Sequence, residues 1–257
     1  MRLFQNIGRI LIIYKFIIYS MNQNKYILIP LGGIGNRFKK DNFKSPKALI
    51  TVNNKCIIYW LLDNLEIPTN YTILIPYNKA EYELFDLENK IRNRYTKIKF
   101  KFYPLEKTTK GAVETINICL QNFSMDLSCY PVLSPHQALK YHDGPILCID
   151  SDNFYLQNII EEWNGENKIF VFKDTQSNPI FSYVKKDDNN KILEIIEKEK
   201  ISNLACCGAY GFNKPVEFIK SAKKLLKISN DVYISHIILD MILNGKNFNI
   251  ISTRFRG

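Results

Sequence analysis

Short apolar runs alternate with amphipathic stretches along the chain from residue 25 onward. The runs are apolar throughout, which is typical of parallel strands that are covered on both faces. Strands that alternate with helices in this way predict an α/β fold with a doubly wound sheet, mixed but mostly parallel. The expected strands cover residues 26–30, 71–75, 97–103, 146–149, 168–172, 204–212 and 250–252. The expected helices cover residues 56–65, 80–94, 111–122, 216–227 and 234–243.

Some stretches depart from this alternation. Residues 181–184 and 192–196 flank an Asp-Asp-Asn-Asn turn, a pattern that predicts a β-hairpin. Residues 125–143 hold two prolines and no periodic pattern, so we expect a loop or insertion there. We divide the chain into an apolar N-terminal extension, residues 1–20, and one domain over residues 21–257. From about Asn153 onward this domain is expected to form a smaller lobe.

The chain carries a formal net charge of +10, which suits an anionic partner such as a nucleotide. A solvated, lysine-rich surface is the alternative explanation of this charge. No Arg-rich tract with interleaved aromatic residues occurs, so we expect no nucleic-acid partner. The cysteines show neither a CxxC pair nor a metal-ligand spacing, a pattern typical of a reducing compartment, and we expect a cytoplasmic protein.

Residues 9–19 form an apolar run that Lys15 interrupts. The run is too short for a spanning helix, and no small-residue cleavage site of a signal peptide follows it. We therefore expect no stable membrane insertion, with a weak membrane anchor as the alternative.

A glycine-rich loop, residues 32–35, follows the first apolar run and precedes two basic residues, Arg37 and Lys47. Glycines allow the backbone N–H groups to approach a phosphate chain closely. Arginine can bind phosphate through two hydrogen bonds, and lysine adds a compact charge. The dinucleotide motif would need a glycine at Phe38, and the Walker motif is absent. The loop therefore indicates another kind of phosphate site, although a simple tight turn remains an alternative.

Asp150 and Asp152 close the strand expected at residues 146–149. One or two carboxylates beside bound phosphates are enough to hold Mg²⁺, which keeps several of its water ligands. In an α/β sheet, both this strand end and the glycine loop lie where ligands bind. We therefore expect a magnesium site at this strand end, while an ordinary turn after a strand is the alternative.

The loop and the residues after it resemble the N-terminal signature of the sugar-1-phosphate nucleotidyltransferase family. The matching residues are Gly32, Gly33, Gly35, Arg37, Phe38, Pro46, Lys47 and Leu49. The resemblance implies that the loop wraps a nucleoside triphosphate and that Arg37, Lys47 and Asp152 are catalytic. The nucleotide-binding residues that it implies are Leu31, Gly32, Gly33, Ile34, Gly35, Asn36, Arg37, Lys47, Gly111 and Ala112.

Later segments resemble the same family less closely. The pair Glu197 and Lys198 is similar to a Glu-Lys strand end that contacts the sugar, although a solvated charge run is an equal alternative. Gly208 and Tyr210 match a sugar-binding stretch in which Cys206 replaces the usual Asn. The resemblance also implies that Asp152 is the magnesium ligand, and that there is a second metal ligand, for which we choose Asp231. A helix N-cap is an equally good interpretation of that residue.

The resemblance implies an enzyme that joins a nucleoside triphosphate to a sugar-1-phosphate and releases pyrophosphate, with Mg²⁺ as cofactor. The substrates that we favour are UTP and N-acetylglucosamine-1-phosphate. Alternatives are thymidylyl, guanylyl or cytidylyl transfer to a hexose or heptose phosphate or to phosphocholine. Two further alternatives are an Asp-x-Asp glycosyltransferase and a non-catalytic ligand-sensing relative. The sequence is also compatible with an oligomer.

Overall fold

The computed structural model describes residues 24–33, 45–125 and 144–253. Its largest element is a nine-stranded sheet. Seven of its strands have the order β11-β7-β10-β6-β1-β4-β5, and the other two form the hairpin β8–β9, which pairs with β10 through β8. The bounds are β1 Lys25–Leu28, β4 Tyr71–Asn78, β5 Lys99–Leu105, β6 Ile146–Ile149, β7 Lys168–Lys173, β8 Ser182–Lys186, β9 Ile192–Glu197, β10 Leu204–Phe212 and β11 Asn249–Ser252.

Parallel and antiparallel pairs both occur in this sheet. β1 pairs in parallel with β4 and β6, β4 with β5, and β7 with β11. β10 runs antiparallel to both β6 and β7, and thereby joins the later strands to the parallel core. The predicted α/β class and mixed sheet are therefore confirmed. The part of the chain after Asn153 adds its strands to the same sheet.

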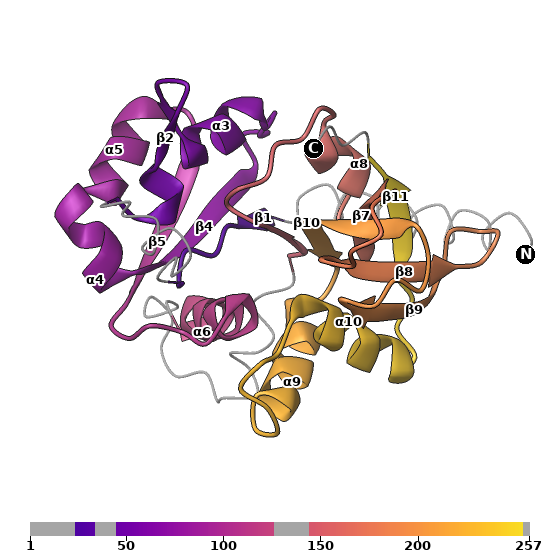
Figure 1. Cartoon of the computed structure of the whole chain (residues 1–257). Coiled ribbons are helices and arrows are strands. Elements are labelled where there is room, and N and C mark those ends of the chain that lie inside the picture. Colours follow the sequence, from indigo (N-terminus) through magenta and orange to yellow (C-terminus); the bar gives the residue numbers. More distant parts are fainter. Residues whose placement is uncertain (1–23, 34–44, 126–143, 254–257) are drawn as a thin grey trace, which may run out of the picture.

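Helices cover both faces of the sheet (Figure 1). Ile27 of β1 and Ile29, just after it, belong to one buried cluster, whose members from α-helices come from α3, α4, α5 and α8. Leu28 points to the other cluster, with α6, α9 and α10. Because side chains alternate across a strand, an apolar run buries both faces, as the sequence predicts. The helix bounds are α3 Ile57–Asn64, α4 Lys79–Tyr82, α5 Leu87–Arg94, α6 Ala112–Met125, α8 Ile159–Trp163, α9 Pro215–Leu225 and α10 Ile234–Leu243.

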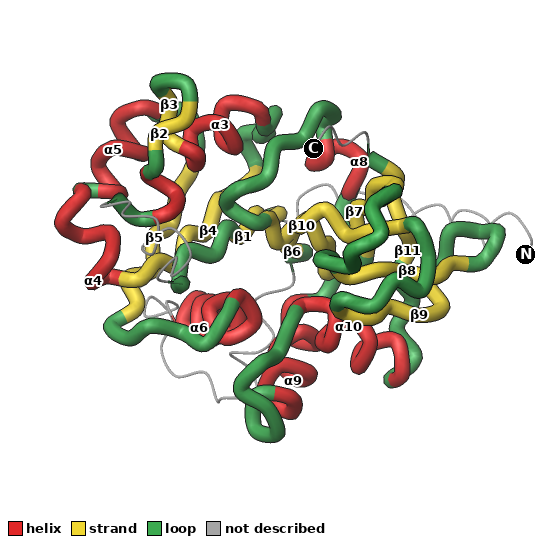
Figure 2. Tube along the Cα trace, viewed as in Figure 1, coloured by secondary structure: helices red, strands yellow, loops and turns green. Residues whose placement is uncertain are grey.

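The order of the strands reverses beside β1. The chain passes from β1 to β4 and β5 on one side, and then returns to β6 on the other side. The strands form a band between the helices in Figure 2. A reversal of this kind leaves a crevice at the carboxyl ends of the two neighbouring strands, where α/β proteins bind ligands.

The prediction of one continuous helix over residues 80–94 is wrong, because the structure divides this segment into two helices. α4 is followed by a 3₁₀ turn, η2 Glu83–Phe85, and then by α5. The break lies at Asp86, whose backbone is left-handed with φ 54°. The carboxylate of Asp86 accepts a hydrogen bond from Asn89 at 2.7 Å. A short polar side chain that bonds locally is one of the few that tolerate this conformation.

The predicted hairpin of β8 and β9 is confirmed. Its turn is closed by Asp187, whose carboxylate accepts hydrogen bonds from the backbone N–H groups of Asn189 and Lys191 at 2.9 Å each. The extension at residues 1–20 and nearly all of the loop predicted at 125–143 lie outside the described residues. Within residues 24–33, 45–125 and 144–253, no helix is long and apolar enough to cross a membrane.

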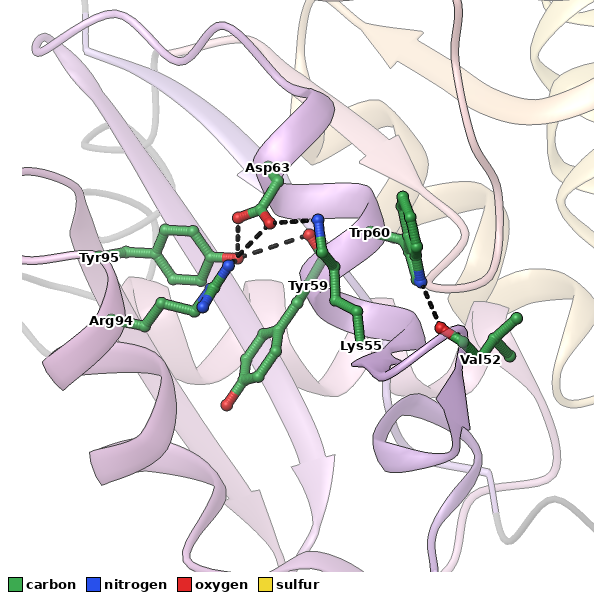
Figure 3. A network of polar contacts seen from close by, with 7 residues as sticks. All are labelled: Val52, Lys55, Tyr59, Trp60, Asp63, Arg94 and Tyr95. Atoms are coloured by element: carbon green, nitrogen blue, oxygen red, sulfur yellow. Dashed lines mark hydrogen bonds and ion pairs between the residues drawn. The ribbon is translucent and has the colours of Figure 1, made fainter.

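A polar network holds the residues just before α3 against the helix (Figure 3). A two-stranded hairpin, β2 Thr51–Val52 and β3 Lys55–Cys56, precedes the helix. Asp63 of α3 accepts from Lys55 at 2.9 Å, Arg94 at 2.8 Å and Tyr95 at 2.6 Å. Burial acts to raise the pKa of Asp63, but the hydrogen bonds from Tyr95, Lys55 and Arg94 outweigh it and lower the pKa to about 2. The network therefore ties β3 and α3 to the end of α5.

Candidate active site

The glycine loop begins directly at the carboxyl end of β1. Leu31 continues the strand by donating its N–H to the carbonyl of Pro76 at 2.7 Å. Gly32 follows and lies against α6, because a Cβ there would come within 2.2 Å of Thr115 Oγ1 and 2.6 Å of Thr109 Oγ1. Gly33 meets no such obstacle among the described residues. The close approach of helix and loop therefore requires glycine at Gly32.

Lys47 and Asp152 meet across the mouth of the sheet. Lys47 begins the 3₁₀ turn η1 Lys47–Leu49, which Ala48 and Leu49 anchor in the core. Its ammonium group forms an ion pair with Oδ2 of Asp152, a residue that lies just after β6. Two of the three predicted catalytic residues therefore lie in contact. The third, Arg37, and the predicted loop residues Ile34, Gly35 and Asn36 lie outside the described residues.

Two cavities open beside this ion pair. We name the first the glycine cavity; its volume is about 530 Å³, and it is lined by Pro30, Leu31, Gly32, Gly33, Lys47, Tyr82, Gly111, Ala112, Thr115, Asp150, Ser151, Asp152 and Tyr233. We name the second the lobe cavity; its volume is about 540 Å³, and its lining includes Lys110, Phe172, Phe181, Glu197, Cys206, Gly208, Tyr210 and Asp231. The residues that line both cavities are Gly111, Ala112, Asp150, Asp152 and Tyr233. These shared residues form a common wall between the two spaces.

Asp150 lies at the base of this wall and is half-buried. Burial raises its pKa to about 7, and the negative charge of Asp152 adds to the rise, while Lys47 opposes it. Gly208 of β10 makes room for the carboxylate, because a Cβ at that position would come within 2.5 Å of Asp150 Oδ2. Gly208 also has φ +76°, at an irregularity in the pairing of β10 with β7. Both its space and its backbone therefore require glycine.

The two carboxylates at the end of β6 are suited to a divalent cation. The negative charge of Asp152 makes ionisation of Asp150 more costly, a cost that a bound cation would lower. Mg²⁺ needs only one or two carboxylates when phosphate oxygens and water supply its other ligands. No group of three acidic, His or Cys side chains with metal-binding geometry occurs among the described residues. The donor set therefore fits an ion that substrate helps to hold.

Glu197, at the end of β9, lines the lobe cavity. Its Oε2 accepts hydrogen bonds from the hydroxyl groups of Ser182 and, at 2.9 Å, Ser235. Lys198 does not line either cavity, but its ammonium donates to the Tyr233 hydroxyl at 2.9 Å and lies 4.5 Å from the centre of that ring. The predicted sugar-binding residues Gly208 and Tyr210 line the lobe cavity as well. All four are therefore gathered in or next to one space.

Asp231 lines the lobe cavity but not the glycine cavity. Its backbone N–H donates to Ser229 at 3.1 Å, and its carboxylate lies 3.5 Å from the hydroxyl of Tyr233. The alternative interpretation of Asp231 as a helix N-cap is wrong, because α10 begins at Ile234 with Tyr233 as its N-cap. The side chain of Asp231 is therefore available at the cavity.

Sequence reasoning missed Tyr233, which lines both cavities and bonds Lys198. Lys110, which lines the lobe cavity, donates through its ammonium to the side-chain oxygen of Asn230 and links the start of α6 to the segment before α10. The only signal for Tyr233 is its place just before an apolar helical pattern, which marks a helix start but not a cavity wall.

No protein-family model and no curated relative matches the sequence. Solved structures do resemble this one. A nucleoside-diphosphate-sugar pyrophosphorylase from Vibrio cholerae RC9 gives a TM-score of 0.68 at 18% identity, over 88% of this chain and 92% of that one. An inositol-1-phosphate CTP transferase from T. maritima gives 0.62 at 13% identity, over 89% and 85%.

A third structure, a UDP-glucose pyrophosphorylase complexed with UDP-glucose, gives a TM-score of 0.63 at 18% identity, over 91% of each chain. The match extends over most of both chains in each case. The chain therefore has the fold of the nucleotide-sugar pyrophosphorylases and sugar-1-phosphate nucleotidyltransferases.

Proposed function

We propose that this protein is a nucleotidyltransferase that joins a nucleoside triphosphate to a sugar-1-phosphate. The observation that carries the proposal is the Lys47–Asp152 ion pair, because it lies in the wall next to two cavities of similar size. Two substrates have to meet in this reaction, and each needs its own space. The glycine cavity would hold the triphosphate and the lobe cavity the sugar.

In the proposed reaction, a phosphate oxygen of the sugar-1-phosphate attacks the α-phosphorus of the triphosphate. One oxygen–phosphorus bond forms, the bond between the α-phosphorus and the bridging oxygen breaks, and pyrophosphate leaves with the electron pair. Negative charge grows on oxygen atoms during this step. The ammonium of Lys47 and the guanidinium of Arg37 would stabilise that charge, and backbone N–H groups after β1 would hold the phosphates.

Asp150 and Asp152 would hold Mg²⁺, and Asp231 is the proposed further ligand from the lobe side. When bound, the ion would neutralise charge on phosphate oxygens and lower the barrier to displacement. Lys47 would then exchange part of its contact with Asp152 for the phosphates. Gly111 and Ala112 at the start of α6 line both cavities and are the proposed contacts of the nucleoside.

The first substrate pair to test is UTP with N-acetylglucosamine-1-phosphate. The similar structures are described as acting with different partners: glucose-1-phosphate thymidylyl transfer, inositol-1-phosphate with CTP, and UDP-glucose. A nucleotide and a sugar or inositol are common to these names. We propose the same pair of substrate classes here.

The decisive experiment measures pyrophosphate release from ATP, CTP, GTP, UTP and dTTP, each combined with a panel of sugar-1-phosphates and phosphocholine. Turnover with at least one pair is expected, and Lys47→Ala is expected to lower kcat about 10²- to 10³-fold. Lys185→Ala is the matched control, because Lys185 forms an ion pair with Glu194 on the hairpin, outside both cavities.

Turnover that needs a preformed nucleotide sugar and releases no pyrophosphate would instead indicate a glycosyltransferase. Full activity of a folded Lys47→Ala variant would refute the role of the ion pair.

A further inference from the structure

Two serines from different elements hold the same carboxylate oxygen of Glu197. Ser182 lies directly opposite Glu197 in the antiparallel pair of β8 and β9, and its hydroxyl donates to Oε2. Ser235, in the first turn of α10, donates to Oε2 at 2.9 Å. Both serines are nearly inaccessible, with exposed fractions of 8% and 1%. The contacts therefore belong to the interior and do not depend on a mobile surface side chain.

This arrangement divides the carboxylate into two unequal oxygens. A carboxylate oxygen has two lone pairs, and the two hydroxyls can occupy both of those on Oε2. No hydrogen bond to Oε1 comes from the described residues. Because Glu197 lines the lobe cavity, Oε1 is the oxygen that remains for a ligand.

We infer that Ser182 and Ser235 are positioning residues that restrict Glu197 to a single hydroxyl of the acceptor. This inference rests on the proposed function, in which the lobe cavity binds the sugar. A carboxylate with two available oxygens can bridge two neighbouring hydroxyls of a sugar. With Oε2 engaged by protein, Glu197 recognises one hydroxyl through Oε1 and leaves its neighbours to be read by other groups.

The inference predicts that only one hydroxyl of the acceptor depends on Glu197, which analogues lacking single hydroxyls can test. We take the sugar-1-phosphate that releases most pyrophosphate in the panel and compare its monodeoxy analogues. Removal of one hydroxyl is expected to raise KM about ten-fold in the wild type and hardly at all in Glu197→Ala. Two adjacent hydroxyls that both show this dependence on Glu197 would overturn the inference.

Serine variants test the positioning role. Ser235→Ala is expected to raise KM for the acceptor about five- to ten-fold, with kcat and KM for the triphosphate nearly unchanged. Ser182→Thr, which keeps the hydroxyl and suits a strand, should restore what Ser182→Ala loses. Ser221→Ala is the matched control, because Ser221 is a buried serine that bonds the carboxylate of Asp240 away from the site. Equal changes in both KM values would contradict a role specific to the acceptor.

A measurement without turnover separates this inference from the proposed function. In a double-mutant cycle of Ser235→Ala and Glu197→Ala, urea unfolding should show a coupling of about five-fold in the unfolding equilibrium constant. Additive effects would show that the hydroxyl and the carboxylate do not interact, and would overturn the inference whatever the substrate. Absence of pyrophosphate with every pair, together with a clear coupling, would instead reject only the proposed function.

Discussion

The glycine cavity and the lobe cavity have nearly the same volume but differ in the residues that line only one of them. Most of those found only in the glycine cavity are glycines or small side chains, such as Gly32, Gly33 and Ser151. The lobe cavity is built from large aromatic and charged side chains, including Phe172, Phe181, Glu197, Tyr210 and Asp231. Backbone N–H groups suit a phosphate chain, whatever base it carries, whereas long side chains distinguish one polyol from another.

The comparison teaches where specificity for each substrate should lie. Changes in the glycine cavity are expected to affect the common chemistry, and changes in the lobe cavity are expected to affect the choice of acceptor. The wall that both cavities share should affect both. Each of the predictions below can break or sharpen this division.

The largest effect is expected from two of the three acids proposed to hold the metal. Asp152 lines both cavities, whereas Asp231 lines only the lobe cavity. Asp152→Asn should lower kcat about 10³-fold, because it removes charge next to the reacting phosphates. Asp231→Asn should cost about ten-fold and act more through KM of the acceptor. Steady-state kinetics with each substrate varied in turn distinguishes the two.

A larger loss in Asp231→Asn than in Asp152→Asn would reverse the proposed order of these ligands. Circular dichroism and thermal unfolding of both variants provide the control for folding.

The next largest effect is expected on the free energy of unfolding, when either of two neighbouring glycines is replaced by alanine. Gly32→Ala should lower the free energy of unfolding by about 1–3 kcal/mol, because its Cβ would overlap the hydroxyls of Thr115 and Thr109. Gly33→Ala, with no atom of the described residues near its Cβ, should change stability by less than about 1 kcal/mol. Urea unfolding measures both. If the two variants lose equal stability, the close approach of α6 to the loop is not what fixes Gly32.

Tyr233→Phe tests the shared wall. The variant keeps the ring beneath the Lys198 ammonium but loses the hydroxyl that binds it at 2.9 Å. Because the strand end that carries Glu197 and Lys198 is expected to contact the sugar, KM for the acceptor should rise about three- to ten-fold. KM for the triphosphate should change less. An equal rise in both KM values would mean that Tyr233 affects the binding of the two substrates to the same extent.

The smallest effect concerns pH and the network around Asp63. Its folded-state pKa of about 2 lies below the ordinary value of 3.8, so the carboxylate stabilises the fold when it is ionised. That contribution is complete above about pH 4 and is lost as the pH falls through about 2. With allowance for partial exposure of the group, it amounts to about 1–2 kcal/mol.

Unfolding curves of the wild type and of Asp63→Asn measure this contribution. The two should differ by this amount at pH 6 and converge near pH 2. A difference that does not depend on pH would show that the lost packing, and not the charge, explains the variant. Acceptor KM at pH 6 should be unchanged, because Asp63 lies outside both cavities.

Much of the fold could be predicted from the sequence, because apolar runs such as 146–149 have few alternatives to a buried strand. The bounds of β6 and β10 match the prediction fully. The division of residues 80–94 could not be predicted, because the helical pattern continues through Asp86 while its backbone does not. The helix α8 was missed because five residues are too few to show a period.

The site was predictable only in part. Lys47 and Asp152 were named from their motifs, and their contact depends on the parallel pairing of β1 with β6, which no local pattern specifies. Tyr233 was missed because its role comes from the meeting of α10 with β9 in space. The two serines at Glu197 carry no sequence signal either, since a lone serine in a strand or helix is common.

Gly208 has a consequence for anyone who wishes to redesign acceptor choice. A mutagenesis library aimed at the lobe cavity would include this position, yet its left-handed backbone and its contact with Asp150 leave room for no side chain. Ile180, in contrast, borders the same space with about half of its surface open to solvent, at 52%. Diversity introduced at Ile180 can reshape the entrance without disturbing the carboxylates beneath it, so evolvability in this pocket is concentrated at its rim.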